Sequence, residues 1–334
     1  MKAPTPGRWA STEWLEDTLE WGARALAPHG LTLRAWTQPH ARPWSTALRL
    51  ETDADPVWLK APGDGALFEV PLLVLLAELD LPHVPRPLAH DLDRGLVLLP
   101  DGGEVSRVAY GGTTPPERMA DHLALYAHLQ RLTEPHVDAI VALGVGDLRP
   151  TRMPRLLEQT IAVLEAERAP AALSREDAAR LRAVLPAYAE ACAELEASGI
   201  APTLQHDDLH DSNILARGPV IIDWGDSCVG HPFGTMLATL NSIAFHHKLA
   251  PDDPAFGLVV DAYTDAWTDL HDRPTLRRLV SLAQRVGPLT RSLSYRQALT
   301  NVDEPAWREY GDAMPEWLLE VFEADLPRRP PLLG

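Results

Sequence analysis

Apolar and polar residues alternate in short runs through much of the first hundred positions. Before these runs, Ser11 can cap a helix whose apolar residues recur every three or four positions and which ends before Gly30. The strand-like runs cover residues 31–36, 45–51, 56–61, 86–91 and 95–99. Turns are expected at Gln38-Pro39 and at residues 53–56, so the pattern predicts a small antiparallel sheet.

A helical pattern interrupts the strand-like runs at residues 65–79. Asp64 is a candidate N-cap of this helix, and Glu69 falls in its early turns. The strand-like run before it ends at Lys60. The sequence therefore predicts a lysine at the end of a strand, followed directly by a helix that carries a glutamate.

The pattern changes after residues 100–103, Pro-Asp-Gly-Gly, and almost everything beyond them is helical. The main helical stretches are residues 115–133, 175–197, 235–247, 252–270 and 313–322. We therefore expect an α+β fold of two lobes, an N-terminal lobe of residues 1–100 and a mainly helical C-terminal lobe of residues 101–334.

Composition narrows the class of protein. The 334 residues are 46% hydrophobic, enough for a sizeable core, and a formal charge of −17 argues against general affinity for nucleic acid or anionic membranes. With only Cys192 and Cys228, the chain has neither a disulfide framework nor a four-cysteine zinc site. The strongest apolar run, residues 70–79, is too short to cross a bilayer, and the first seven residues lack the apolar segment of a signal peptide. These features predict a soluble cytoplasmic protein.

The candidate chemistry lies in residues 204–226. Asp208 is followed five positions later by Asn213, and Asp223 comes at the end of an apolar run. This spacing suits phosphoryl transfer, in which Asp208 would receive the proton of an acceptor hydroxyl while Asn213 and Asp223 hold Mg²⁺ on a nucleotide. Short β-prone runs at residues 213–216 and 220–222 predict a hairpin that returns Asp223 to Asn213.

The same stretch resembles the catalytic loop of the aminoglycoside phosphotransferase family, small-molecule kinases with the protein-kinase-like two-lobed fold. The family motif is H-G-D-L-H-x-x-N followed by I-D-W or I-D-F, and this chain carries Asp207 where the family usually has glycine. The resemblance implies Mg²⁺-dependent transfer of the γ-phosphoryl group of ATP or GTP to a hydroxyl of a small molecule. An aminoglycoside, amino sugar, sugar or amino alcohol would be such an acceptor. His210 matches the second histidine of the motif.

In kinases, a lysine at the end of such a strand holds the α- and β-phosphates and pairs with a carboxylate of the next helix. We assign these parts to Lys60 and Glu69. Glu78 is a competitor, but it lies more than two turns further along the helix, where a solvated role is expected.

The remaining nucleotide contacts depart from the protein-kinase pattern. The first turn of the sheet contains no glycine, so backbone N–H groups and hydroxyls at Ser45 and Thr46 are the candidates to contact phosphate. The backbone at residues 98–101, including Leu99 and Asp101, is expected to face the nucleotide base. Pro100 cannot be the donor there because it has no N–H.

Two other functions stay open. His206 and His210, four positions apart, could hold the metal of a hydrolase, but only if this segment is a helix. The loop-and-strand pattern argues against that, and bracing of the loop by hydrogen bonds is the expected role of His206. A kinase-like module that binds without turnover is the second alternative. Asp207 and Asp211 keep it open because carboxylates near phosphates repel a nucleotide unless Mg²⁺ offsets them.

The acceptor is expected to be a small molecule. No long activation segment and no A-P-E-like anchor follows Asp223, which argues against a protein acceptor. Acidic residues recur in the last third of the chain, at Asp303, Glu304, Glu309 and Asp312. Near a pocket they would favour a cationic acceptor; away from one they form a solvated face.

Overall fold

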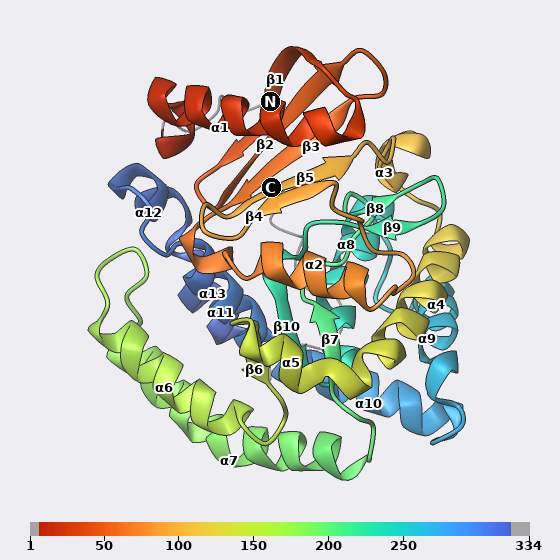
Figure 1. Ribbon diagram of the computed structural model, residues 1–334. Helices are drawn as coiled ribbons and strands as arrows, with labels where there is room; N and C mark the ends of the chain where they lie inside the picture. The colour runs from red at the N-terminus through yellow and green to blue at the C-terminus, as the bar shows by residue number, and fades with distance from the viewer. Residues whose placement is uncertain (1–6, 322–334) are drawn as a thin grey trace.

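The computed structural model describes residues 7–321. An antiparallel sheet of order β1-β2-β3-β5-β4 forms the upper part of the molecule in Figure 1. Its strands are β1 (Leu33–Arg42), β2 (Ser45–Thr52), β3 (Val57–Pro62), β4 (Ala89–Asp91) and β5 (Leu96–Pro100). Helix α1 (Thr12–Leu26) packs on this sheet, and Ser11 caps it as predicted, accepting the N–H of Trp14. The α+β prediction is confirmed.

Strand β1 is longer than the sequence predicted. It continues through Gln38-Pro39 to Arg42, so the turn predicted at that dipeptide is wrong, and the chain reverses at Pro43-Trp44. The pairing with β2 is irregular between Thr37 and His40, around the proline. Proline cannot donate a ladder hydrogen bond, but β1 lies at the sheet edge, where such a residue is tolerated.

Helix α2 (Glu69–Glu78) begins later than predicted, and its N-cap is Phe68, which makes no capping hydrogen bond with its side chain. A 3₁₀ turn at Asp64–Ala66 precedes it. The turn is held against the end of α11: Asn301 donates to Asp64 at 3.0 Å, and a Cβ at Gly65 would lie 1.8 Å from the backbone oxygen of Gln297. These long-range contacts take Asp64 away from the capping role.

The C-terminal lobe is mainly helical. Its helices are α3 (Ser106–Ala109), α4 (Pro116–Thr133), α5 (Val137–Ala142), α6 (Met153–Ala166), α7 (Arg175–Ala197), α8 (Met236–His247), α9 (Pro254–Thr264), α10 (Arg273–Val286), α11 (Pro288–Ala298), α12 (Glu304–Tyr310) and α13 (Ala313–Leu319). The predicted helix at 252–270 is too long, because after α9 the chain turns to bury Trp267. Of the predicted helix at 313–322, Phe322 lies outside the described residues. No helix within residues 7–321 is long and apolar enough to span a membrane.

Strands β6 to β10, which come later in the chain, form two short sheets. Strands β6 (Gly146–Leu148), β10 (Ser227–Gly230) and β7 (Thr203–His206) form one, and the hairpin β8 (Ile214–Leu215) and β9 (Val220–Ile221) forms the other. The predicted hairpin is confirmed, with Ile214 opposite Ile221. Just beyond it, the N–H of Ile222 donates to the backbone oxygen of Asn213 at 2.9 Å. Asp223 therefore follows a residue bonded to Asn213.

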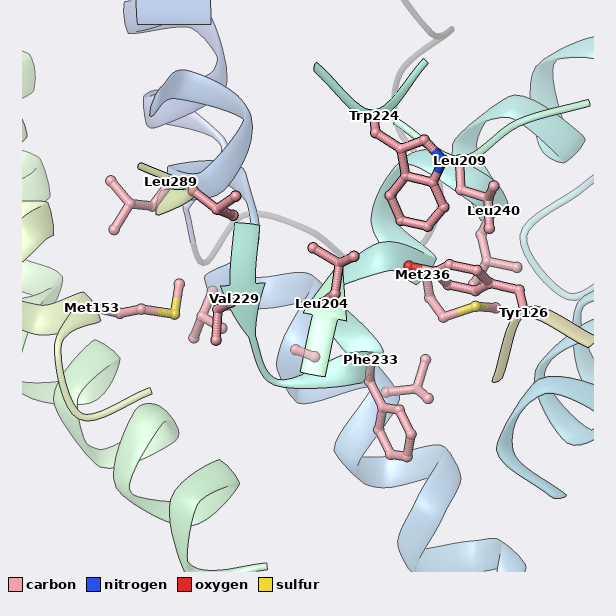
Figure 2. Close-up of a cluster of buried hydrophobic side chains, with 14 of the residues drawn as sticks. Tyr126, Met153, Leu204, Leu209, Trp224, Val229, Phe233, Met236, Leu240 and Leu289 are labelled. Atoms are coloured by element: carbon pink, nitrogen blue, oxygen red, sulfur yellow. The ribbon is translucent and has the colours of Figure 1, made fainter. Parts of the chain in front are cut away.

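The main core surrounds the three-stranded sheet (Figure 2). Leu204 and Val229 from its strands lie among Trp224, Phe233 and Leu289 from the segments around them. Buried side chains of α2 belong to this same cluster, whereas a smaller cluster joins α1 to the five-stranded sheet. Helix α2 is therefore anchored in the core of the C-terminal lobe.

Candidate functional site

A cleft of about 1090 Å³ is lined by residues of the five-stranded sheet and of the helical lobe. The five residues to which the sequence assigned the central roles, Lys60, Glu69, Asp208, Asn213 and Asp223, all line it. Ligand pockets in proteins commonly measure about 300–1,000 Å³. The cleft is therefore large enough for a nucleotide together with a small acceptor.

Lys60 bridges two carboxylates in this cleft. Its Nζ donates to Glu69 Oε1 at 2.6 Å and to Asp223 Oδ1 at 2.5 Å. The predicted Lys60–Glu69 pair is therefore present, and Glu78 is not among the residues that line the cleft. Burial lowers the pKa of Lys60, but the charges of Asp223 and Glu69 outweigh it and hold the pKa above its usual range. The ammonium group stays charged.

Asp223 sits in a left-handed turn between β9 and a 3₁₀ segment, with φ 66° and ψ 58°. Aspartate adopts this conformation more readily than most residues with a side chain. Trp224 anchors the turn, because its buried indole donates to the backbone oxygen of Ile221 at 2.8 Å. The side chain of Asp223 keeps 51% of its surface exposed in the cleft. Burial raises the pKa of this carboxyl, but Lys60 outweighs that effect and lowers it.

The loop from β7 to β8 is held by its own side chains. His206 is buried; its Nε2 donates to the backbone oxygen of Ile222 at 3.0 Å, and its Nδ1 accepts the N–H of Asp208 at 3.3 Å. The predicted bracing by His206 is confirmed. Asn213 donates from Nδ2 to the backbone oxygen of Asp208 at 3.0 Å, which leaves its amide oxygen as the atom suited to a cation.

The two carboxylate oxygens of Asp208 face different partners. Oδ1 lies 3.3 Å from Nη2 of Arg291, and Oδ2 lies 3.5 Å from Nε2 of His210. Burial raises the pKa of Asp208, but the charge of Arg291 and the contact with His210 outweigh it, so the pKa lies below its usual range. The carboxylate is ionised at neutral pH and accepts hydrogen bonds only.

Asp207 and Asp211 do not line the cleft, so the expectation that they crowd the phosphates is wrong. Asp207 is buried and accepts a hydrogen bond of 2.8 Å from Thr290. Asp211 accepts from Nε of Arg107 at 2.8 Å and from the N–H of Thr114 at 2.9 Å. Both carboxylates are paired inside the fold, because a buried charge without partners is costly.

Arg291, on α11, is the site residue that the sequence did not single out. Its side chain is 8% exposed and lies close to Asp207 and Asp208, with Asp226 also acting on its charge. Burial raises the pKa of Asp226 to about 7, even though Arg291 opposes the rise. The first five residues of α11, 288–292, are all buried although three of them are polar, so the sequence pattern gives no sign of this burial.

The turn between β1 and β2 takes the place of the glycine-rich loop of protein kinases. Ser45 lines the cleft, with its Oγ 3.2 Å from Nε2 of His40. Thr46 is fully buried, and its hydroxyl donates to the backbone oxygen of His40 at 2.8 Å, so the structure does not bring its side chain to the cleft. At the tip of the turn, Trp44 packs edge-on against Tyr310 of α12, with ring centroids 5.0 Å apart.

Part of the cleft lining comes from the end of β5 and the chain that follows it. Leu99 and Asp101, predicted to face the nucleotide base, are both among these residues. Asp101 accepts the N–H of Gly103 at 2.9 Å, which fixes the turn after β5. Leu73 and Ile222 are among the apolar side chains that line the cleft with them. The surface suits a flat, partly apolar ring.

The cleft lining also contains acidic residues. Glu309, Asp312 and Glu316, from α12 and α13 and the turn between them, contribute to it. Asp303 and Glu304, the other acidic residues considered from the sequence, are not among the lining residues. Asp303 caps α12, and Glu304 pairs with two arginines.

The two histidines of the loop do not fit the metal site of a hydrolase. The segment is not a helix, and both ring nitrogens of His206 are used within the fold. His210 accepts the N–H of Ser212 at its Nδ1, at 3.2 Å. In the part of the chain that the structure describes, no three His, Cys, Asp or Glu side chains are grouped to hold a metal ion.

Comparison with known proteins bears on both the fold and the chemistry. Residues 36–234 match the phosphotransferase enzyme family. A search of curated proteins gives no match. Among solved structures, macrolide 2′-phosphotransferase of Brachybacterium faecium is similar over 88% of this chain and 98% of its own, with 18% identity and a TM-score of 0.57.

Two further solved structures come from small-molecule kinases. Ethanolamine kinase of Plasmodium vivax matches 86% of this chain and 83% of its own, with 15% identity and a TM-score of 0.55. Choline kinase of Cryptosporidium parvum matches 86% of this chain and 89% of its own, with 10% identity and a TM-score of 0.58. At these identities the likeness establishes the fold alone, and the predicted two-lobed, protein-kinase-like fold is confirmed.

Proposed function

Because the chain belongs to the phosphotransferase enzyme family, we propose that it transfers the γ-phosphoryl group of ATP or GTP to a hydroxyl of a small molecule, with Mg²⁺ as cofactor. One observation carries the proposal: the Lys60–Glu69 pair meets Asp208, Asn213 and Asp223 in a single cleft. These residues come from both lobes, so their convergence is a property of the fold rather than of local sequence.

In this proposal the N-terminal lobe, residues 1–100, binds the nucleotide. Lys60 contacts the α- and β-phosphates, and Glu69 orients its ammonium group. Ser45 faces the phosphates from the tip of the sheet, while the backbone at Leu99 and Asp101 lies against the base. The presence of Leu99 and Asp101 in the cleft lining supports this orientation of the nucleotide.

The oxygens beside Lys60 fit Mg²⁺. The amide oxygen of Asn213 and the carboxylate of Asp223 are hard ligands, and Mg²⁺ in such sites takes one or two protein oxygens together with phosphate oxygens and water. When bound, the ion neutralises charge on the β- and γ-phosphates. Asp223 is suited to this role because its carboxylate is ionised and half exposed in the cleft.

Asp208 acts as the base. It accepts the proton of the acceptor hydroxyl as the hydroxyl oxygen attacks the γ-phosphorus. The new oxygen–phosphorus bond forms while the bond from the γ-phosphorus to the bridging oxygen breaks, and the electron pair of that bond leaves with the nucleoside diphosphate. A base of low pKa serves chiefly by orienting the hydroxyl, because its driving force for removing a proton is small.

The acceptor is a small molecule that carries a positive charge, held by the C-terminal lobe. Glu309, Asp312 and Glu316 line the cleft and supply negative charge to it. The names of the macrolide phosphotransferase, the ethanolamine kinase and the choline kinase reported above say that these proteins act on small molecules. Their shared fold supports a small acceptor without selecting one of these compounds.

A cytoplasmic location is part of the proposal. Cys192 and Cys228 are both buried and unpaired, which suits a reducing compartment. The formal charge of −17 argues against nucleic acid as a partner.

A module that binds a nucleotide without turnover is the weaker candidate. It was suggested by the extra carboxylates of Asp207 and Asp211, which would repel phosphates. Both are paired within the fold, Asp207 beside Arg291 and Asp211 with Arg107. Lys60, Asp208, Asn213 and Asp223 all line the cleft, so no residue proposed for turnover is missing from it.

The test is a phosphate-transfer screen with radiolabelled ATP and GTP in the presence of Mg²⁺. The acceptor panel comprises aminoglycosides, macrolides, amino sugars, choline, ethanolamine, neutral sugars and a generic protein substrate. We expect transfer to at least one small hydroxyl compound, and loss of that transfer in Asp208→Asn. Transfer to protein alone would contradict the small-molecule assignment, and Mg²⁺-nucleotide binding without transfer to anything would favour the binding module.

A further inference from the structure

Arg291 is a buried cation that the proposed reaction does not use. It lies near the start of α11, and only 8% of its side chain is exposed. Figure 1 shows α11 below the five-stranded sheet. Removing a guanidinium group from water is costly unless carboxylates and hydrogen bonds compensate. The partners of Arg291 therefore indicate what the site gains from holding it there.

The first partner is Asp207. Nη1 of Arg291 donates to the backbone oxygen of Asp207 at 3.0 Å and lies 3.7 Å from its Oδ2. The carboxylate of Asp207 also accepts from Thr290 at 2.8 Å and from Ser294 at 3.3 Å, both on α11. Asp207 thus joins the catalytic loop to α11 and supplies a negative charge beside the guanidinium group.

The second partner is Asp208. Nη2 of Arg291 lies 3.3 Å from Oδ1, while Oδ2 is 3.5 Å from His210. Contacts to both oxygens restrict rotation of the carboxylate about its Cβ–Cγ bond. The rings of Tyr295 and Trp317 each lie 5.7 Å from the guanidinium carbon, which restricts movement of Arg291 itself.

We propose that Arg291 is a positioning residue, which holds the carboxylate of Asp208 in the orientation that receives the acceptor hydroxyl, and that Asp207 is the counter-charge that allows the arginine to be buried. The proposal rests on the proposed function of Asp208 as the base. It also explains why an aspartate occupies position 207, where the aminoglycoside phosphotransferase family usually has glycine. The negative charge of Asp207 balances the positive charge of the buried Arg291.

Arg291 acts through Asp208 in this proposal, not on the transferred phosphoryl group. Loss of orientation at a reacting group can slow a reaction by about 10²-fold without weakening binding of the other substrate. An arginine that stabilised the phosphoryl group directly would still matter after Asp208 had been replaced. A double-mutant cycle therefore separates the two roles.

The experiment compares Arg291→Gln, Arg291→Lys, Asp208→Asn and the double variant Asp208→Asn/Arg291→Gln, using Mg-ATP or Mg-GTP and the best acceptor of the screen. Arg291→Gln should lower kcat roughly 10- to 100-fold, with the KM for nucleotide unchanged within about twofold. Arg291→Lys should recover part of the loss, because it keeps the charge but cannot contact both aspartates as a planar group. The double variant should be no slower than Asp208→Asn. Arg296→Gln, an exposed arginine on the same helix, is the matched control and should be unchanged.

Crystal structures of wild type, Arg291→Lys and Arg291→Gln give a readout that does not depend on turnover. We expect the carboxylate of Asp208 to rotate or to occupy two orientations in the glutamine variant. If wild type transfers phosphate to no acceptor, the proposed function fails, yet these structures still decide whether Arg291 orients Asp208. If the glutamine variant does not fold, the lysine variant and Asp207→Asn provide the same comparison. An unmoved Asp208 overturns the proposal, and so does an equal loss of kcat in the Asp208→Asn background.

Discussion

The ammonium group of Lys60 and the carboxylate of Asp223 lie 163 residues apart in the chain and are joined by a 2.5 Å hydrogen bond in the cleft. The bond links β3 of the five-stranded sheet to the turn that follows β9. Lys60 also holds Glu69 at the start of α2. One lysine therefore organises a buried carboxylate of α2 and the exposed carboxylate proposed to hold Mg²⁺.

Replacement of Lys60 by methionine should weaken Mg-nucleotide binding about 10- to 100-fold, since charge-assisted hydrogen bonds contribute roughly 1.5–3 kcal/mol. Isothermal titration with Mg-ATP and Mg-GTP measures the loss. Lys248→Met is the control, because Lys248 is exposed at the end of α8 and does not line the cleft. Melting without nucleotide measures separately the cost of leaving Glu69 unpaired. Unchanged affinity in Lys60→Met would exclude the proposed phosphate contact.

Replacement of Asp208 and replacement of Asp223 should affect different steps. Asp208→Asn should cut turnover by about 10²–10⁴-fold and leave Mg-nucleotide binding nearly intact, because it removes a base and no proposed metal ligand. Asp223→Asn should abolish most of the Mg²⁺-dependent rise in melting temperature that a nucleotide produces. For wild type that rise corresponds to roughly 2.7 kcal/mol at a hundred times the dissociation constant. Full turnover in Asp208→Asn would show that the base is another group.

Removing acidic charge from the cleft should weaken binding of a cationic acceptor. Asp312→Asn should raise the KM for such an acceptor about fivefold at low salt, which corresponds to roughly 1 kcal/mol for one charge in a solvated site. The difference should shrink at high salt because exposed charges are screened. Asp93→Asn, an exposed residue that does not line the cleft, is the control. A neutral sugar as the best substrate, with no salt dependence, would remove the cationic preference and leave phosphoryl transfer intact.

His231 should make the protein less stable in mild acid. Burial lowers the pKa of this histidine to about 3, so the folded protein keeps it neutral while the unfolded chain protonates it below its ordinary pKa of 6.5. The unfolded state then binds more protons, and stability falls as the pH drops from about 6.5 towards 3. By pH 5 this group should cost about 2 kcal/mol of unfolding free energy relative to pH 7.5.

Urea unfolding of His231→Asn at pH 7.5 and pH 5 tests this expectation. Asparagine can take over the hydrogen bond that Nδ1 of His231 accepts from the N–H of Phe233. The variant should lose about 2 kcal/mol less than wild type between the two pH values. The exposed His128→Asn variant should follow wild type. Equal pH dependence in wild type and His231→Asn would mean that His231 is protonated in the folded protein.

Much of the fold could be predicted from the sequence, because the decisive signals are local. Ser11 marks the start of α1 through its own hydrogen bond, and the turn residues 217–219 place the β8–β9 hairpin. The Lys60–Glu69 pair followed from chain order, since a strand ending in lysine leads directly to a helix with a glutamate. Such signals need no knowledge of the remaining chain.

The errors concern positions whose role is set by distant partners. Pro39 suggested a turn, but β1 is an edge strand, where a missing N–H costs little. Thr46 has the right chemistry for phosphate, yet its hydroxyl bonds within the β1–β2 hairpin. Asp207 looked like an excess charge until α11 brought Arg291 beside it. The spacing of residues along the sequence could not predict the contact between Asp207 and Arg291.

The contact between α11 and the Asp64–Ala66 turn affects how the cleft can move. The N-terminal lobe meets the helical lobe at several places: along the chain after Pro100, through the buried face of α2 in the main core, and where Gln297 and Asn301 meet Gly65 and Asp64. A rotation of the whole N-terminal lobe away from the helical lobe would therefore separate buried side chains, which costs free energy. A bulkier residue at position 65 would push against the backbone oxygen of Gln297 and weaken one of these contacts.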